Sequence, residues 1–205
     1  MPSSRKPKNT WVLVAVGAFA LLLAVIVVSL DRIATPIDGV IRVGALLGYQ
    51  AVFLAALSSN YMRELTRYFG RSFPTLHHIA SVGALAALIV HATGVALRAG
   101  SPAVFLPEFR SFQLFFSLGG RPALWLIAIA SLAGLFRAAI GKNWRFIHWL
   151  NYIAFLLGTI HALLIGPNFT HIGVRIVSGA MAFALVAVFV NKRATEYKRS
   201  RKKRA

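Results

Sequence analysis

The chain has 205 residues, is 58% hydrophobic with a mean hydropathy of +0.68, and contains no cysteine. This hydropathy favours an integral membrane protein over a soluble domain, and the lack of cysteine excludes disulfides, thiolate-bound zinc and iron–sulfur clusters. The formal charge of +18 does not indicate a nucleic-acid-binding protein, because the basic residues form short clusters between apolar runs, as in the topology signals of membrane proteins.

Six apolar runs separated by polar connectors predict six transmembrane helices, since each run is close to the length of about 20 residues that crosses a bilayer. In chain order the runs are 10–30, 39–58, 76–97, 122–139, 144–164 and about 171–190. The predicted fold is therefore an all-α integral membrane protein, with a six-transmembrane-helix bundle at 10–190, a basic N-terminus at 1–9 and a basic tail at 191–205.

The first two runs carry signals of their own. The first run is longer than the apolar core of a secretory signal, so we expect a retained helix. In the second run, Gly44 and Gly48 predict close packing against another helix. The segment 60–75 that follows is a basic connector, and Pro74 is expected to break the chain just before the third run.

The longest connector, residues 98–120, has an unusual composition. It carries five phenylalanines among prolines and charged side chains. A segment of this kind is expected to lie in the membrane interface and to cover one end of the bundle.

The distribution of basic residues predicts how the bundle is oriented. Of the 23 Lys and Arg residues, 17 lie in the N-terminus, in the connectors after the second and fourth runs, and in the tail. Basic connectors face the cytoplasm, so both termini are expected to be cytoplasmic. We expect a multi-pass protein of the cell (inner) membrane, whose tail contacts solvent or lipid headgroups.

Histidines occur at two levels of the third and fifth runs. His77 and His91 are 14 residues apart, which separates them by roughly 21 Å along an ideal helix and leaves them nearly in phase. His148 and His161 are 13 residues apart and about 140° out of alignment, so their helix must tilt, tighten or distort locally. His78 is the alternative to His77 at the cytoplasmic level, although it is about 140° out of phase with His91.

Imidazole inside hydrocarbon is costly and therefore suggests a function. All five acidic residues lie in connectors or the tail, so neither histidine level has the carboxylates of a zinc or di-iron site. Paired neutral imidazoles on two helices suit two b-type haems, and a haem with two histidine ligands transfers electrons. The haem propionates need cations, for which we expect the arginines on the outer side: Arg42, Arg98, Arg110 and Arg121.

The stretches RSFPTLHHIASVGALAALIVH and FIHWLNYIAFLLGTIHALLIG resemble the third and fifth helices of the ferric-reductase-like transmembrane domain. That superfamily includes NADPH oxidases, ferric reductases and MsrQ, the haem subunit of the periplasmic methionine sulfoxide reductase system. The resemblance implies that His77 and His148 ligate an inner haem b through its iron, and that His91 and His161 ligate an outer one.

Oxidases and reductases of this superfamily continue into a cytosolic flavin and nicotinamide domain, but this sequence contains no G-x-G-x-x-G fingerprint. We therefore expect a separate electron donor, either a cytoplasmic flavoprotein reductase or membrane quinol. The acceptor at the outer face is a redox protein, ferric iron or oxygen. The predicted function is transmembrane electron transfer by one-electron steps, as an oxidoreductase or an electron-transfer subunit.

Two other functions stay open at the level of the sequence. A proton-coupled transporter or channel would use intramembrane histidines as a proton relay, and it would employ His78 and His171, which haem ligation leaves unused. The lack of intramembrane carboxylates argues against it. A purely structural membrane subunit would leave the two histidine levels unexplained.

Overall fold

The computed structural model describes residues 9–202, and these residues form only helices and their connections. The α-helices are α1 (Thr10–Ser29), α2 (Pro36–Ser58), α3 (Met62–Phe69), α4 (Phe73–Ala99), α5 (Phe112–Ser117), α6 (Gly120–Leu135), α7 (Arg137–Ile140), α8 (Trp144–His148), α9 (Leu150–Ile165) and α10 (Ile172–Lys202). The 3₁₀ helices are η1 (Pro102–Phe105), η2 (Gly141–Asn143) and η3 (Pro167–Thr170).

Several of these helices are long and apolar enough to cross a membrane. In the described residues the candidate spans are the five stretches Trp11–Ser29, Pro36–Ser58, Phe73–Ala99, Arg137–Ile165 and Ile172–Lys198. Helix α6 is apolar but has only 16 residues, about 24 Å of helix, because helical geometry is interrupted at Phe136. The prediction of an all-helical, multi-pass membrane protein is confirmed, while the predicted fourth span at 122–139 is a shorter helix.

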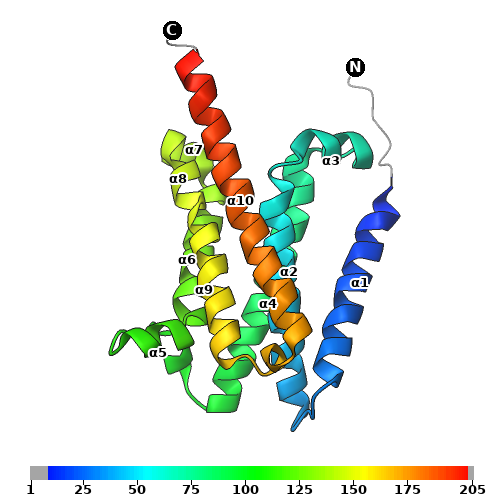
Figure 1. Cartoon of the computed structure of the whole chain (residues 1–205), viewed down its shortest axis with the longest axis vertical. Coiled ribbons are helices and arrows are strands. Elements are labelled where there is room, and N and C mark those ends of the chain that lie inside the picture. The colour runs from blue at the N-terminus through cyan, green and yellow to red at the C-terminus, as the bar shows by residue number, and fades with distance from the viewer. Residues whose placement is uncertain (1–8, 203–205) are drawn as a thin grey trace.

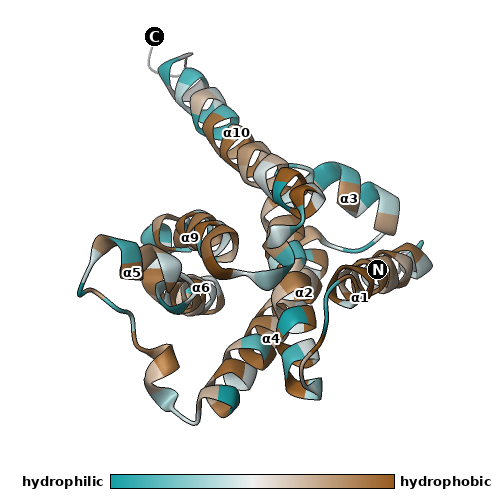
Figure 2. Ribbon diagram, turned by 60° about the horizontal axis from the view of Figure 1, so that its bottom comes forward, coloured by the Kyte–Doolittle hydropathy of each residue, from teal (hydrophilic) through white to brown (hydrophobic). Residues whose placement is uncertain are grey.

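The long helices run along a common axis, and the start of α1 and the end of α10 lie at the same end of the bundle (Figure 1). We refer to this end, which also carries α3 and α8, as the terminal end. The opposite, loop end carries the turn between α1 and α2, the connector 100–119 and η3. Within the bundle, α2 packs along α4 and α6 packs along α9 (Figure 2).

Glycines bring α2 and α4 close together. A Cβ added at Gly48 would lie 2.6 Å from Leu88 Cδ2, and one at Gly44 would lie 3.1 Å from the carbonyl oxygen of Ala87. Small residues allow such close approach between helices in a membrane, where packing replaces the hydrophobic drive. The packing role predicted for Gly44 and Gly48 is confirmed, and it sets the backbone of α2 beside the face of α4 that carries His91.

The structure differs from the sequence prediction in three segments. The connector 60–75 contains α3, which ends at Gly70, a residue with a φ of 65° that favours glycine. Pro74 lies in the first turn of α4 instead of before it, a position where proline is tolerated. Helix α10 continues through residues predicted as a solvated tail, as far as Lys202, because no glycine or proline interrupts this polar stretch.

Candidate functional site

Histidines from α4 meet histidines from α8 and α9 at both levels of the bundle. At the terminal end, the ring centroids of His77 and His148 are 6.0 Å apart, with 66° between the ring planes. At the loop end, His91 and His161 line the same cavity. The two rings at the terminal end are thus close enough that both could ligate one metal ion.

Each of these four histidines is held in the same way. Its Nδ1 lies within hydrogen-bond distance of a backbone carbonyl oxygen, and because a carbonyl oxygen only accepts, Nδ1 carries the proton. Nε2 is then the unprotonated nitrogen that can ligate a metal, as in most histidine ligands of metal sites. The bonds run from His77 to Ala55 (3.2 Å), His91 to Ile41 (3.0 Å), His148 to Ala130 (2.9 Å) and His161 to Ser117 (2.6 Å).

The neighbouring His78 is placed differently. Its side chain is exposed, and its ring contacts that of His77 at a centroid distance of 6.3 Å. The half-buried His77, in contrast, faces His148. The structure therefore brings His77 to the terminal-end pair and leaves His78 outside it.

The fifth predicted span is interrupted directly after His148. Trp149 separates α8 from α9, and its N–H group is shared between the carbonyl oxygens of Arg145 (3.1 Å) and Phe146 (3.2 Å). The N–H group of Tyr152 lies 2.9 Å from the carbonyl oxygen of Trp149. These three-residue hydrogen bonds tighten the helix, adding rotation relative to an α-helix. A tightened turn is one of the three changes, beside tilt and local distortion, that the spacing of His148 and His161 predicts, and it is present at this point.

The loop-end cavity has a volume of about 510 Å³ and lies between the helix pairs α2–α4 and α6–α9. This volume is within the range of about 300–1,000 Å³ that is usual for ligand sites. Its inner part is apolar, with Leu88, Ile127 and Phe155 in the wall. The cavity can thus hold a largely apolar ligand of cofactor size between His91 and His161.

Arginines surround the cavity toward the loop end. Arg32, Arg42, Arg98 and Arg121 all line it. Arg98 forms an ion pair with Asp38 at 2.6 Å, and Arg121 donates to the carbonyl oxygens of Ala103 (3.3 Å) and Leu106 (3.2 Å).

Arg110, a further cation predicted for the site, does not line this cavity. It lies on the connector surface with its side chain 80% exposed and pairs with Glu108 at 2.7 Å. Hydrogen bonds from the Arg110 side chain lower the pKa of Glu108 to about 2, so this pair stays charged above acidic pH. The structure therefore brings Arg98 and Arg121 to the cavity and leaves Arg110 outside it.

The connector after α4 borders the cavity. Val104 of η1 and Leu118 are among the lining residues. The indole N–H group of Trp125 on α6 donates to the carbonyl oxygen of Phe105 at 2.8 Å, which fixes η1 to the bundle. The connector thus borders the cavity at this end of the bundle, while its place in the membrane interface stays a prediction.

Sequence reasoning missed two polar residues of the cavity wall. Asn168 of η3 accepts a hydrogen bond from Arg42, although its place in a short link gave no signal. The hydroxyl of Tyr49 lies 3.0 Å from Thr159 Oγ1, and the Tyr49 ring stacks on Phe155 at a centroid distance of 4.6 Å. Tyr49 lies in α2 midway between Ile41 and Ala55, whose carbonyls hold the two α4 histidines, so it lies between the histidine levels.

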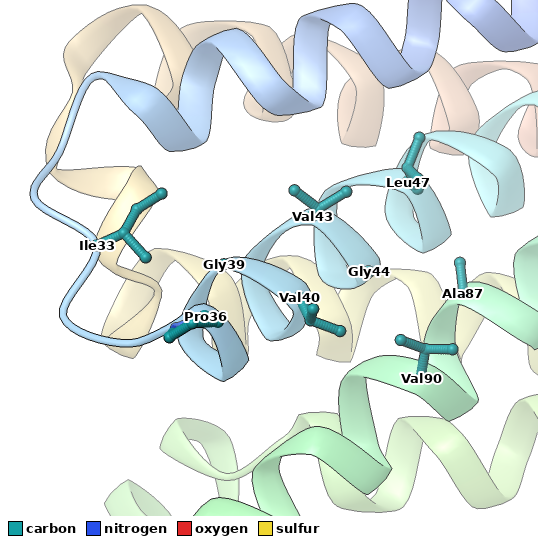
Figure 3. A pocket seen from close by; sticks show the side chains of 9 residues that line it. All are labelled: Ile33, Pro36, Gly39, Val40, Val43, Gly44, Leu47, Ala87 and Val90. Carbon is teal, nitrogen blue, oxygen red and sulfur yellow. The ribbon is translucent and has the colours of Figure 1, made fainter.

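A second hollow lies on the other side of α2, between α2 and α4 (Figure 3). Its lining is hydrocarbon and glycine, including Val43, Gly44, Leu47, Ala87 and Val90. No histidine, arginine or other polar side chain is part of this lining. Of the two hollows, only the cavity between the helix pairs has histidines and arginines in its lining.

Comparison with known families gives one match. The model of the family described as "Ferric reductase like transmembrane component" matches residues 43–159, more than half of the chain. The matched stretch includes His77, His91 and His148 and ends two residues before His161. Comparisons with curated proteins and with solved structures found no match.

Proposed function

Because the chain belongs to the ferric reductase-like transmembrane component family, we propose that it carries electrons across the cell membrane through two b-type haems, each ligated by two histidines. His77 and His148 hold the haem at the terminal end, and His91 and His161 hold the haem at the loop end. When bound, the haems supply one-electron chemistry, and the protein supplies their ligation, spacing and electrostatic surroundings.

One observation carries this proposal: all four histidines donate Nδ1–H to a backbone carbonyl. The bonds favour the tautomer with an unprotonated Nε2, the nitrogen that could ligate iron. At His77 this nitrogen also lies 3.4 Å from the hydroxyl of Ser81. Four identical hydrogen bonds of this kind would not help histidines to relay protons. A relay needs nitrogens that can exchange protons in sequence, whereas the carbonyls hold each Nδ1 proton in place.

The cavity also has a shape that fits a haem. A Cβ added at Gly120 would lie only 3.0 Å from Nε2 of His161, so glycine keeps open the space next to the nitrogen that would ligate iron. The apolar inner wall suits the macrocycle, and the arginines toward the loop end suit its carboxylates.

Two of the four arginines that line the cavity are not paired with a carboxylate in the described residues, and they could bind the two propionates of a haem. Arg42 is paired with Asp31 and Arg98 with Asp38, while Arg32 and Arg121 have no carboxylate partner in residues 9–202. A b-type haem carries two propionates, and charge-assisted hydrogen bonds to arginine stabilise such groups. Arg32 and Arg121 are therefore the proposed propionate partners, and Arg98 contributes positive potential from the same wall. Arg110 is not part of the lining and is not assigned either role.

We further propose that α6 completes a six-span bundle with both termini in the cytoplasm. Two features support this topology: the start of α1 and the end of α10 lie at one end of the bundle, and the basic residues of α3 and of the end of α10 gather there (Figure 1). Electrons would enter at this end from a separate cytoplasmic flavoprotein reductase or from membrane quinol. They would leave at the loop end to a redox protein, ferric iron or oxygen.

Purified protein is expected to be red and to contain two haems b per chain. With both axial positions filled by imidazole, the reduced-minus-oxidised spectrum should have the bands of low-spin haem b. Absorbance spectroscopy and a pyridine haemochrome assay against protein concentration measure both properties. A colourless preparation from cells supplied with haem would contradict the proposal and favour a proton relay instead.

Replacing Arg121 with glutamine is expected to lower the midpoint potential of the loop-end haem. Removing a positive charge from the cavity wall destabilises the reduced haem, which carries one more negative charge than the oxidised haem. Arg110→Gln is the matched control, because it removes the same charged group from the loop end, where Arg110 pairs with Glu108 and does not line the cavity. Potentiometric titration followed by haem absorbance measures the effect. Equal potentials in both variants would exclude Arg121 as a propionate partner.

A further inference from the structure

Polar side chains from four segments form a connected chain at the loop end. Nε2 of His171, just before α10, lies 2.9 Å from Oδ1 of Asp31 in the turn after α1. The other carboxylate oxygen of Asp31 accepts from Nη2 of Arg42 on α2. Nε of Arg42 donates to Oδ1 of Asn168 at 2.9 Å, and Nδ2 of Asn168 donates to the carbonyl oxygen of Val27 at 3.1 Å.

This chain of contacts connects the cavity to solvent. Arg42 and Asn168 line the cavity together with His91 and His161. The Arg42 side chain is only 9% exposed, whereas the His171 side chain is 34% exposed. A buried guanidinium needs a counter-charge, which Asp31 provides, so the charge on Asp31 acts on the cavity and on His171 at once.

His171 can change its charge without breaking its bond to Asp31. A carboxylate oxygen only accepts, so Nε2 of His171 carries a proton and donates it to Asp31. The additional proton of the charged imidazole is therefore carried by Nδ1. Both the neutral and the charged imidazole keep the same contact with Asp31, so a change of charge at Nδ1 leaves this hydrogen bond intact.

The other charged groups around His171 keep their charge from about pH 5 to 8. Partial burial raises the pKa of Asp31, but hydrogen bonds from His171 and Arg42 outweigh it and hold that pKa below the usual value. Arg32 follows Asp31 in the chain, and Arg175, whose N–H bonds to the His171 carbonyl at 3.2 Å, lies one turn on in α10. Arginine stays protonated at these pH values, so neither Arg32 nor Arg175 takes up or releases a proton here.

We propose that reduction of the loop-end haem is coupled to uptake of one proton from the outer solution by Nδ1 of His171, an inference that rests on the proposed haem function. An electron on a haem held by His91 and His161 would add one negative charge to the cavity that Arg42 also lines. The proton then adds one positive charge at the other end of the Arg42–Asp31–His171 chain and offsets it. When the acceptor removes the electron, Nδ1 releases the proton to the same solution.

The test is a redox titration of the purified protein at several pH values between 5 and 8. The loop-end midpoint potential is expected to fall as the pH rises, because the charged imidazole that stabilises the reduced state is lost. The slope reaches at most about 59 mV per pH unit. This is the value for uptake of one proton with each electron, because one pH unit is a tenfold change in proton concentration. The terminal-end haem is expected to show a smaller slope.

Two variants of His171 and one control variant test whether His171 is the residue that takes up the proton. His171→Gln keeps a donor to Asp31 without a titrating proton, so its loop-end potential should be independent of pH and equal to the wild-type value at pH 8. His171→Lys keeps a positive charge and should hold the wild-type value of pH 5. His78→Gln, an exposed histidine at the terminal end, should keep the wild-type slope.

The outcomes separate this inference from the proposed function. Protein without haem would contradict the proposed function itself. Protein with two haems whose loop-end potential does not vary with pH, or whose slope survives in His171→Gln, would overturn the coupling and leave the electron-transfer function standing.

Discussion

Replacing His91 with alanine is expected to halve the haem content, from two haems per chain to one, while the terminal-end haem keeps its spectrum. His91 and His161 line one cavity, and each offers an Nε2 to the same site. Removing one of them leaves an iron position open, and a haem bound by a single histidine is released more easily and loses its low-spin spectrum. Pyridine haemochrome assays and reduced-minus-oxidised spectra measure the content and ligation.

Double substitutions make this test sharper. His161→Ala should have the same effect as His91→Ala, and the pair together should lose no more than either alone, because both remove the same haem. Combining His91→Ala with His77→Ala should instead leave no haem. If His91→Ala and His161→Ala removed different haems, the pairing of these residues across the cavity would be wrong.

The sequence predicted those parts of the fold that depend on local composition. Apolar runs marked the long helices, and the pair Gly44 and Gly48 marked the face of α2 that packs on α4. The spacing of His148 and His161 predicted a distorted helix, because 13 residues cannot bring two rings into line on an ideal α-helix. The turn at Trp149 is that distortion, although the spacing alone did not locate it.

Features that depend on contacts distant in sequence were not predictable. The hydrogen bonds from the histidines go to backbone carbonyls of α2, α6 and the end of α5, and a backbone group leaves no mark in the sequence. The network from Asp31 to Asn168 joins residues more than 100 positions apart. Asp31 and Asn168 gave no signal in their connectors, while Arg42 and His171 had been considered only for separate roles, so the sequence did not indicate that the four lie together.

The arginines show why charge counts alone do not define a site. Arg110 lies on the expected side, but Glu108, two residues earlier, forms an ion pair with it at the surface. Arg32 had no special signal, yet it lines the cavity without a carboxylate partner in the described chain. Which cation can serve a ligand depends on which carboxylates lie near, and those neighbours are set by tertiary structure.

Of the adjacent pair His77 and His78, only His77 is expected to ligate the terminal-end haem. His77→Ala should lower the haem content from two per chain to one, whereas His78→Ala should keep two. In the structure, Nδ1 of His77 donates to the carbonyl oxygen of Ala55, and its ring centroid is 6.0 Å from that of His148. Neighbours on a helix point about 100° apart, so His78 cannot reach the same partner while α4 stays regular.

The two alanine variants form a matched pair, since they remove the same side chain from consecutive positions of one helix. A general loss of stability near the start of α4 would affect both, whereas loss of a ligand affects one. The spectra add a second measure, because the haem that remains in His77→Ala should have the potential of the loop-end site and its pH dependence. If His78→Ala loses the haem and His77→Ala keeps both, the first turns of α4 must be rotated relative to this structure, and His78 is the ligand.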